Sequence, residues 1–150
     1  MNLVWTPHVT VAAVIEQDGR FLLVRERSGG RLVFNQPAGH LEDRESLLQA
    51  VVRETLEETA WQFTPEAIVG IYRWRHPGKQ ETYMRVTFTG RGTLHQPARA
   101  LDPDIEQVVW LDMDEVRQRH AELRSPLVLR SIEDYLAGAR YPLALLADVD

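Results

Sequence analysis

Three carboxylates lie close together in the segment RETLEE, residues 53–58, at Glu54, Glu57 and Glu58. At about 100° per residue, they fall on one face of a helix. Like charges at this spacing cost a helix roughly 0.2–0.5 kcal/mol per pair, so the face is either solvated or neutralised from outside. Several oxygen ligands on one face are what a hard divalent cation such as Mg²⁺ requires. A solvated acidic surface is the alternative, because the spacing alone does not distinguish a metal site from such a surface.

The segment around these carboxylates is expected to form a helix from about Asp43 to Thr59, because it contains no Gly or Pro. A second set of side chains recurs at helical spacing and defines a packed arc: Leu48, Val52, Leu56 and Thr59. Leu47, Ala50 and Val51 lie beneath the acidic face, so the pattern predicts a helix that is covered on more than one side and not half solvated.

The segment from Gly39 to Trp61, GHLEDRESLLQAVVRETLEETAW, resembles the Nudix box, G-x(5)-E-x(7)-R-E-U-x-E-E-x-G-U, in which U is a bulky apolar residue. The matching positions are Gly39, Glu45, Arg53, Glu54, Glu57, Glu58 and Trp61. Two positions depart: Thr55 stands where the family usually has an aliphatic residue, and Ala60 where it has Gly. Ala60 would cost about 1 kcal/mol if the helix ends in the left-handed conformation.

The resemblance implies a fold and an activity for the whole chain. PHVTVAAVI, FNQPAGHLE and LRSPLVLRSIEDYLAGARYPL are similar to a bacterial phosphatase of the family. The implied fold is a single α/β (α+β) domain over residues 1–150, an α/β/α sandwich with a mixed β-sheet and flanking helices. The implied activity is hydrolysis of a pyrophosphate bond by metal-activated water, with Mg²⁺, or alternatively Mn²⁺, as cofactor. Nucleoside di- and triphosphates and thiamine-pathway pyrophosphates, such as thiamine diphosphate, are the implied substrates.

The resemblance also assigns roles by position. It implies that Glu54, Glu57 and Glu58 bind metal together with the backbone carbonyl of Ala38. Glu45 and Arg53 would support the site, with the Arg53 cation orienting the surrounding acids.

The general base is open between a box glutamate, Glu57 or Glu58, which we favour, and an acid from a distant loop. Asp104 and Glu106 precede a strand expected to end near Trp110; Glu106 is the second choice for the base and also a candidate substrate-binding residue.

Candidate substrate-binding cations are Arg25 and the arginines around a predicted hairpin, Arg73, Arg75 and Arg85. As alternating strand residues, the last three could share a face; solvated charge at a sheet edge is the competing interpretation. Trp5, Trp74 and Tyr83 could stack on a ring, although a lone aromatic residue in a strand more often packs in the core.

Periodicity and turn residues predict the remaining elements. A hairpin is expected from His8–Ile15 and Arg20–Arg25, joined through Asp18-Gly19, and NQPAG is expected to be an irregular loop. The other expected strands are Leu32–Phe34, Ala67–Trp74, Thr82–Thr89 and Ile105–Leu111. Two helices should follow, one capped by Asp112 and ending near Arg119, the other from Pro126 to about Ala137 after Ser125.

Composition narrows the class of protein. The chain has 150 residues, of which 44% are apolar, a net charge of -5 and no cysteine. We therefore expect a cytoplasmic domain that acts on a phosphorylated small molecule and binds neither nucleic acid nor membranes. It could be a monomer or a homodimer. Two alternatives to a small-molecule enzyme stay open: a non-catalytic Nudix-fold nucleotide-binding module and an RNA 5′-pyrophosphohydrolase.

Overall fold

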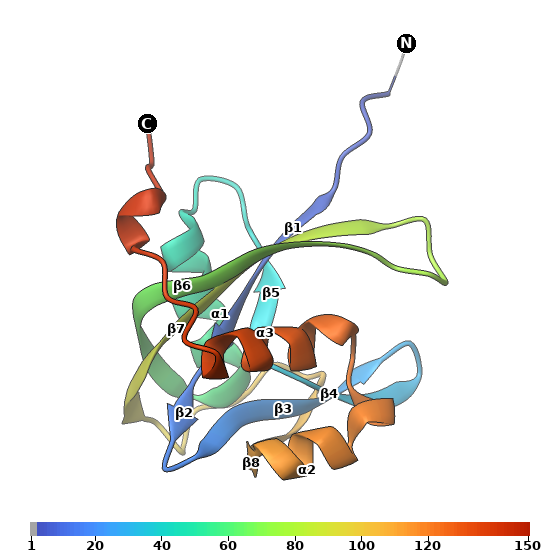
Figure 1. Cartoon of the computed structure of the whole chain (residues 1–150), viewed down its shortest axis with the longest axis vertical. Helices are drawn as coiled ribbons and strands as arrows, with labels where there is room; N and C mark the ends of the chain where they lie inside the picture. Colours follow the sequence, from blue (N-terminus) through green and yellow to red (C-terminus); the bar gives the residue numbers. More distant parts are fainter. Residues whose placement is uncertain (1–2) are drawn as a thin grey trace.

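Residues 3–150 are described by a computed structural model (Figure 1). The strands are β1 (His8–Val14), β2 (Glu16–Gln17), β3 (Arg20–Ser28), β4 (Arg31–Asn35), β5 (Ala38–His40), β6 (Trp61–Arg75), β7 (Thr82–His95) and β8 (Ile105–Asp112). The helices are α1 (Leu47–Thr59), α2 (Met113–Gln118) and α3 (Pro126–Leu136), with short 3₁₀ turns η1 (His120–Glu122) and η2 (Leu143–Leu145).

The strands form two sheets rather than one. The first is mixed and has the order β5-β1-β7-β6, in which β1 and β7 run parallel and the other neighbours run antiparallel. In the second sheet, β3 pairs antiparallel with β2, β4 and β8. In Figure 1 the paired strands β6 and β7 extend beyond the body as a long arm.

Helices cover both sides of the strands because alternate residues of β1 face two different cores. Val11 and Ala13 belong to a core that includes Ala50 and Val51 of α1. Val14 belongs to a second core with Ile132 of α3. The expected α/β/α arrangement with a mixed sheet is therefore confirmed. No helix within residues 3–150 is long and apolar enough to cross a membrane.

Helix α1 starts later than its sequence pattern suggested, at Leu47 instead of about Asp43. Arg44 has a positive φ of 64°, which is incompatible with the helix. Ser46 then caps the first turn, since its side chain accepts from the Gln49 N–H while the Gln49 side chain accepts from the Ser46 N–H. Absence of Gly and Pro was thus a poor guide to the helix start, whereas the end at Thr59 was predicted correctly.

The first predicted hairpin was wrong in its main pairing. Asp18-Gly19 does turn the chain, but only Glu16–Gln17 pairs with Arg20–Phe21, and β1 pairs with β5 and β7 in the other sheet. The segment NQPAG was expected to be irregular, yet Ala38 begins β5 and aligns with Ala12 of β1. Short-range turn signals therefore identified the bend and missed which strands meet across it.

The later elements agree with expectation. Strand β8, helix α2 with Asp112 as its N-cap and helix α3 with Ser125 as its N-cap all form where predicted. Strands β6 and β7 run further than predicted, because register shifts near Pro65 let a proline-containing stretch join the ladder.

Candidate active site

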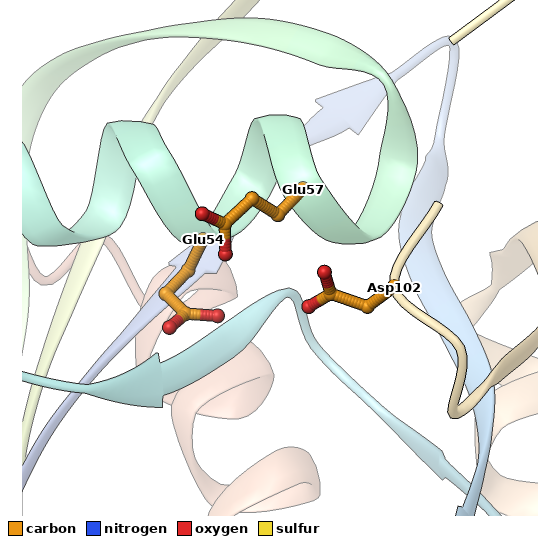
Figure 2. A group of neighbouring side chains, drawn as sticks. All are labelled: Glu54, Glu57 and Asp102. Carbon is orange, nitrogen blue, oxygen red and sulfur yellow. The ribbon is translucent and has the colours of Figure 1, made fainter. Parts of the chain in front are cut away.

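Two carboxylates of α1 and one from a distant loop point toward one another (Figure 2). Glu54, Glu57 and Asp102 each offer a ligand oxygen, and these oxygens lie within 4.8 Å of one another. Glu54 and Glu57 are one helical turn apart, so both project from the same side of α1. This all-oxygen donor set fits a hard divalent cation such as Mg²⁺.

The sequence pattern did not identify Asp102; the acids weighed instead were Asp104, from the same loop, and Glu106, which lies in β8. The loop is tied to the helix by the Asp102 N–H, which donates to the Glu57 carbonyl at 3.0 Å. The run LDPDIE, which leads into β8, offered three acids, and spacing alone could not show which one turns toward α1. Glu106 instead forms an exposed 2.9 Å ion pair with Arg27.

Glu58 lies beside this group in a more enclosed position, with 7% of its surface exposed. Its Oε1 accepts from the Ala38 N–H at 2.9 Å. Burial raises the pKa of Glu58 to about 9, against the opposing effect of that hydrogen bond. The expected metal role of Glu58 and of the Ala38 carbonyl stays a prediction; both residues line the same cavity as Glu54.

Arg53 connects the acids of the box. Its Nε and Nη2 bind the two carboxylate oxygens of Glu45 at 2.7 and 2.9 Å, and its Nη1 donates to Glu54 at 2.7 Å and Glu57 at 3.3 Å. The Arg53 hydrogen bond lowers the pKa of Glu45, whereas burial raises the pKa of Glu54. One cation therefore offsets part of the repulsion among these three acids; the supporting role expected for Arg53 and Glu45 stays a prediction.

Three small or short residues of the box shape the helix environment. A Cβ on Gly39 would collide with the Glu54 carboxylate, so glycine leaves the room that this side chain occupies. Ala60 ends the helix in the left-handed conformation with φ 61°, the geometry that favours glycine. Thr55 is fully buried, and its hydroxyl has no hydrogen-bond partner in the described chain. Both departures from the box therefore carry a local cost.

A cavity of about 350 Å³ opens beside the carboxylates. Its lining contains Glu54, Glu58 and Asp102, together with Glu26 and Arg85. This volume lies within the range of small-ligand sites, roughly 300–1,000 Å³.

The predicted substrate-binding residues separate on folding. Arg85 lines the cavity, but Arg25, Arg73, Arg75 and Glu106 do not. The expectation that Arg73, Arg75 and Arg85 share a face is wrong, because Arg85 pairs with Tyr72 and Arg73 pairs with Met84. Directly opposed residues point to the same side of a sheet, so the exposed Arg73 and Arg75 lie on the face opposite Arg85.

The chain that carries this acidic helix and cavity matches a known family. The family model for the NUDIX domain matches residues 6–130. The chain belongs to the Nudix family. The segment resembling the box is therefore the Nudix box of a Nudix domain that spans most of the chain.

Relatives confirm the family and place the chain among its hydrolases. It is 40% identical over 142 residues to phosphatase NudJ of Escherichia coli K12, covering 95% of this chain and 92% of the relative. It is 50% identical to a solved NUDIX hydrolase from Nitrosomonas europaea, with a TM-score of 0.94, covering 96% of this chain and 98% of the other. The chain is thus a Nudix hydrolase, as its sequence predicted.

A more distant structure shares the fold alone. The NUDIX domain of Shewanella oneidensis NrtR, solved with ADP ribose, is 21% identical with a TM-score of 0.73, and 89% of each chain is covered.

Proposed function

We propose that this Nudix hydrolase cleaves the pyrophosphate bond of a small phosphorylated substrate in a Mg²⁺-dependent reaction centred on Glu54, Glu57 and Asp102. The observation that carries the proposal is the convergence of these three carboxylates within 4.8 Å beside the cavity. When bound there, Mg²⁺ would lower the pKa of a water molecule and neutralise charge on the phosphate oxygens. Mn²⁺, which also accepts oxygen ligands, is the alternative cation.

The chain's own residues hold the acids and move the proton. Arg53 keeps Glu54 and Glu57 oriented through hydrogen bonds of 2.7 and 3.3 Å, and Glu45 fixes Arg53 in turn. Glu58 is our choice for the proton acceptor, since it lies beside the three carboxylates in the same cavity and outside their group; the positive charge of a bound cation would favour the ionised form of Glu58 that this role requires. The attacking oxygen then loses its proton to Glu58 as the bond to phosphorus forms and the bridging oxygen leaves with its electron pair.

Cavity size and relatives support the substrate class. A cavity of about 350 Å³ suits a nucleotide or a thiamine-pathway pyrophosphate, and a NudJ relative carries the name phosphatase. The net charge of -5 disfavours triphosphorylated RNA, the substrate of one rival. The other rival, a binding module without turnover, has no chemical need for the converged acids. We also propose the cytoplasm as the compartment, consistent with the absence of cysteine, and a monomer or homodimer as the working form.

The test is a substrate panel assayed for phosphate or pyrophosphate release with Mg²⁺. The panel contains nucleoside di- and triphosphates, ADP-ribose, thiamine diphosphate, hydroxymethylpyrimidine diphosphate and triphosphorylated RNA. Glu57→Gln should lower kcat/KM by about 100-fold or more, equivalent to about 2.7 kcal/mol of transition-state stabilisation.

Glu66→Gln is the matched control, because Glu66 forms an exposed 3.2 Å pair with Arg91 and does not line the cavity. The proposal would be wrong if the enzyme turned over no member of the panel, or if Glu57→Gln turned over the substrates as fast as the parent. Faster cleavage of triphosphorylated RNA than of mononucleotides would favour the RNA rival.

A further inference from the structure

Two oppositely charged side chains outside the Nudix box lie buried against the cavity. Glu26 of β3 is 4% exposed and Arg85 of β7 is 7% exposed, and both line the cavity that contains Glu54 and Asp102. Charged groups are seldom buried to this degree unless they are paired or have a ligand. Their hydrogen bonds show which of their atoms remain for a ligand.

Glu26 uses one carboxylate oxygen within the protein. Its Oε1 accepts from Arg124 Nη1 at 2.6 Å and from Asn35 Nδ2 at 3.2 Å. Its Oε2 receives no hydrogen bond from any residue in the range 3–150. Glu26 therefore presents a fixed carboxylate with an acceptor oxygen still available.

Arg85 is held in place by two amide side chains and not by a carboxylate. Its Nη1 donates to Gln36 Oε1 at 3.1 Å, and its Nη2 donates to Asn35 Oδ1 at 3.4 Å. Gln36 is itself anchored, because its Nε2 donates to Ser131 Oγ of α3 at 2.7 Å. Further N–H groups of the planar guanidinium are left without an acceptor in the described chain.

Asn35 joins the two groups, since its Nδ2 donates to Glu26 while its Oδ1 accepts from Arg85. An acceptor on Glu26 and donors on Arg85 are thereby held side by side. Aromatic side chains complete the surroundings: Trp74 and Tyr83 line the cavity with ring centroids 5.8 Å apart. Flat apolar walls beside fixed polar groups suit a planar ring.

The acids of the helix orient the substrate in the cavity. The proposed function places the diphosphate at Glu54, Glu57 and Asp102. Glu26 and Arg85 line the same cavity, and the charge of Glu26 is already paired with Arg124 at 2.6 Å. The remainder of the substrate therefore lies within reach of these two residues.

Building on the proposed function, we propose that Glu26 and Arg85 select a flat nitrogen heterocycle by one edge that carries an N–H donor next to an acceptor. Glu26 accepts from the N–H, and Arg85 donates to the neighbouring ring nitrogen or carbonyl oxygen. Nucleobases and aminopyrimidines have such an edge. An ionised carboxylate has no proton to donate, so Glu26 can bind the ring only by accepting from the ring N–H. A substrate that lacks this N–H leaves Glu26 without a partner and should therefore be cleaved less efficiently.

The test compares uridine diphosphate with 3-methyluridine diphosphate, which differ at the N–H that Glu26 would bind. The parent enzyme should cleave the methylated substrate with kcat/KM at least about tenfold lower. Glu26→Met removes the acceptor and should bring the ratio of the two kcat/KM values to within about twofold of unity. Glu26→Gln keeps an acceptor oxygen and the side-chain shape, so its ratio should fall between those of the parent and Glu26→Met.

Glu66→Gln, on the exposed part of β6, should keep the parental ratio. Equal cleavage of both diphosphates by the parent would overturn the assignment of Glu26 and leave the proposed function standing. A parental ratio in Glu26→Met, with both rates lowered together, would also overturn it, because Glu26 would then support the fold or the diphosphate.

If Glu26→Met does not fold, Glu26→Gln decides: a ratio equal to the parent's overturns the proposal. Absence of turnover of every diphosphate would overturn both proposals.

Discussion

The backbone N–H of Asp102 donates to the carbonyl oxygen of Glu57 at 3.0 Å, joining the loop before β8 to the last turn of the acidic helix. This hydrogen bond leaves both carboxylates free to meet Glu54. The Ile105 N–H closes the loop by donating to the Asp102 carbonyl at 3.0 Å. Backbone hydrogen bonds at both the N–H and the carbonyl of Asp102 therefore hold this loop residue against the helix.

Asp102→Asn should lower Mg²⁺ affinity by at least about tenfold, because it removes one negative charge from the group of three while keeping the backbone hydrogen bond. Isothermal titration calorimetry with Mg²⁺ measures the change without relying on turnover. Glu66→Gln should bind Mg²⁺ like the parent. Parental affinity in Asp102→Asn would mean that Asp102 is not a ligand.

Gly39→Ala should impair the site, since the new methyl group would collide with the Glu54 carboxylate. We expect weaker Mg²⁺ binding and a loss of about 1–3 kcal/mol in the free energy of unfolding. Gly78→Ala is the control, because a Cβ there would meet only His76 at an ordinary 3.4 Å. Calorimetry and urea denaturation of both variants test this, and equal behaviour would contradict it.

Ala60→Gly should stabilise the protein by up to about 1 kcal/mol, because Ala60 holds φ 61° where glycine is not strained. Loss of the buried methyl group offsets part of the gain. Ala137→Gly is the matched control at the end of α3, where φ is -75° and no strain exists to be relieved. Thermal unfolding should show a higher Tm for Ala60→Gly alone; a Tm below that of the parent would argue against strain at this position.

Thr55→Val should raise the free energy of unfolding by about 1 kcal/mol, since it replaces a buried hydroxyl that has no partner in the described residues with a methyl group. Thr59→Val provides the contrast, because Thr59 Oγ1 donates to the Thr55 carbonyl at 2.6 Å and accepts from the Trp61 N–H at 3.1 Å. The two variants should therefore shift the urea midpoint in opposite directions. Destabilisation by Thr55→Val would indicate that its hydroxyl has a partner in solution.

Stability of the metal-free protein should fall as pH rises from about 5 to about 9. Burial raises the pKa of Glu58 from 4.5 to about 9, so across this window the folded state retains a proton that the unfolded chain has released. Unfolding then releases protons and becomes easier as pH rises. Urea denaturation in a chelator should show the slope in the parent and in Glu66→Gln, and a smaller slope in Glu58→Gln. An unchanged slope in Glu58→Gln would assign the effect to other groups.

The sequence by itself determined the acidic helix, the helix end at Thr59, the later helices with their caps, and the family. These features depend on local spacing: carboxylates one turn apart share a face in any helix, and Asp112 or Ser125 caps whatever helix follows it. Gly39 and the box acids are likewise recognisable because their separation along the chain is fixed.

Only the tertiary structure decided which residues from other segments join the acids of the Nudix box. Asp102 reaches Glu57 across a loop closed by backbone hydrogen bonds, and the register Tyr72 to Arg85 turns Arg85 toward the cavity while Arg73 and Arg75 face away. A shift of one residue in that register would reverse these faces, and no local pattern in β6 or β7 fixes it. Contacts between segments far apart in sequence depend on how two sheets and three helices pack, which spacing within one segment does not encode.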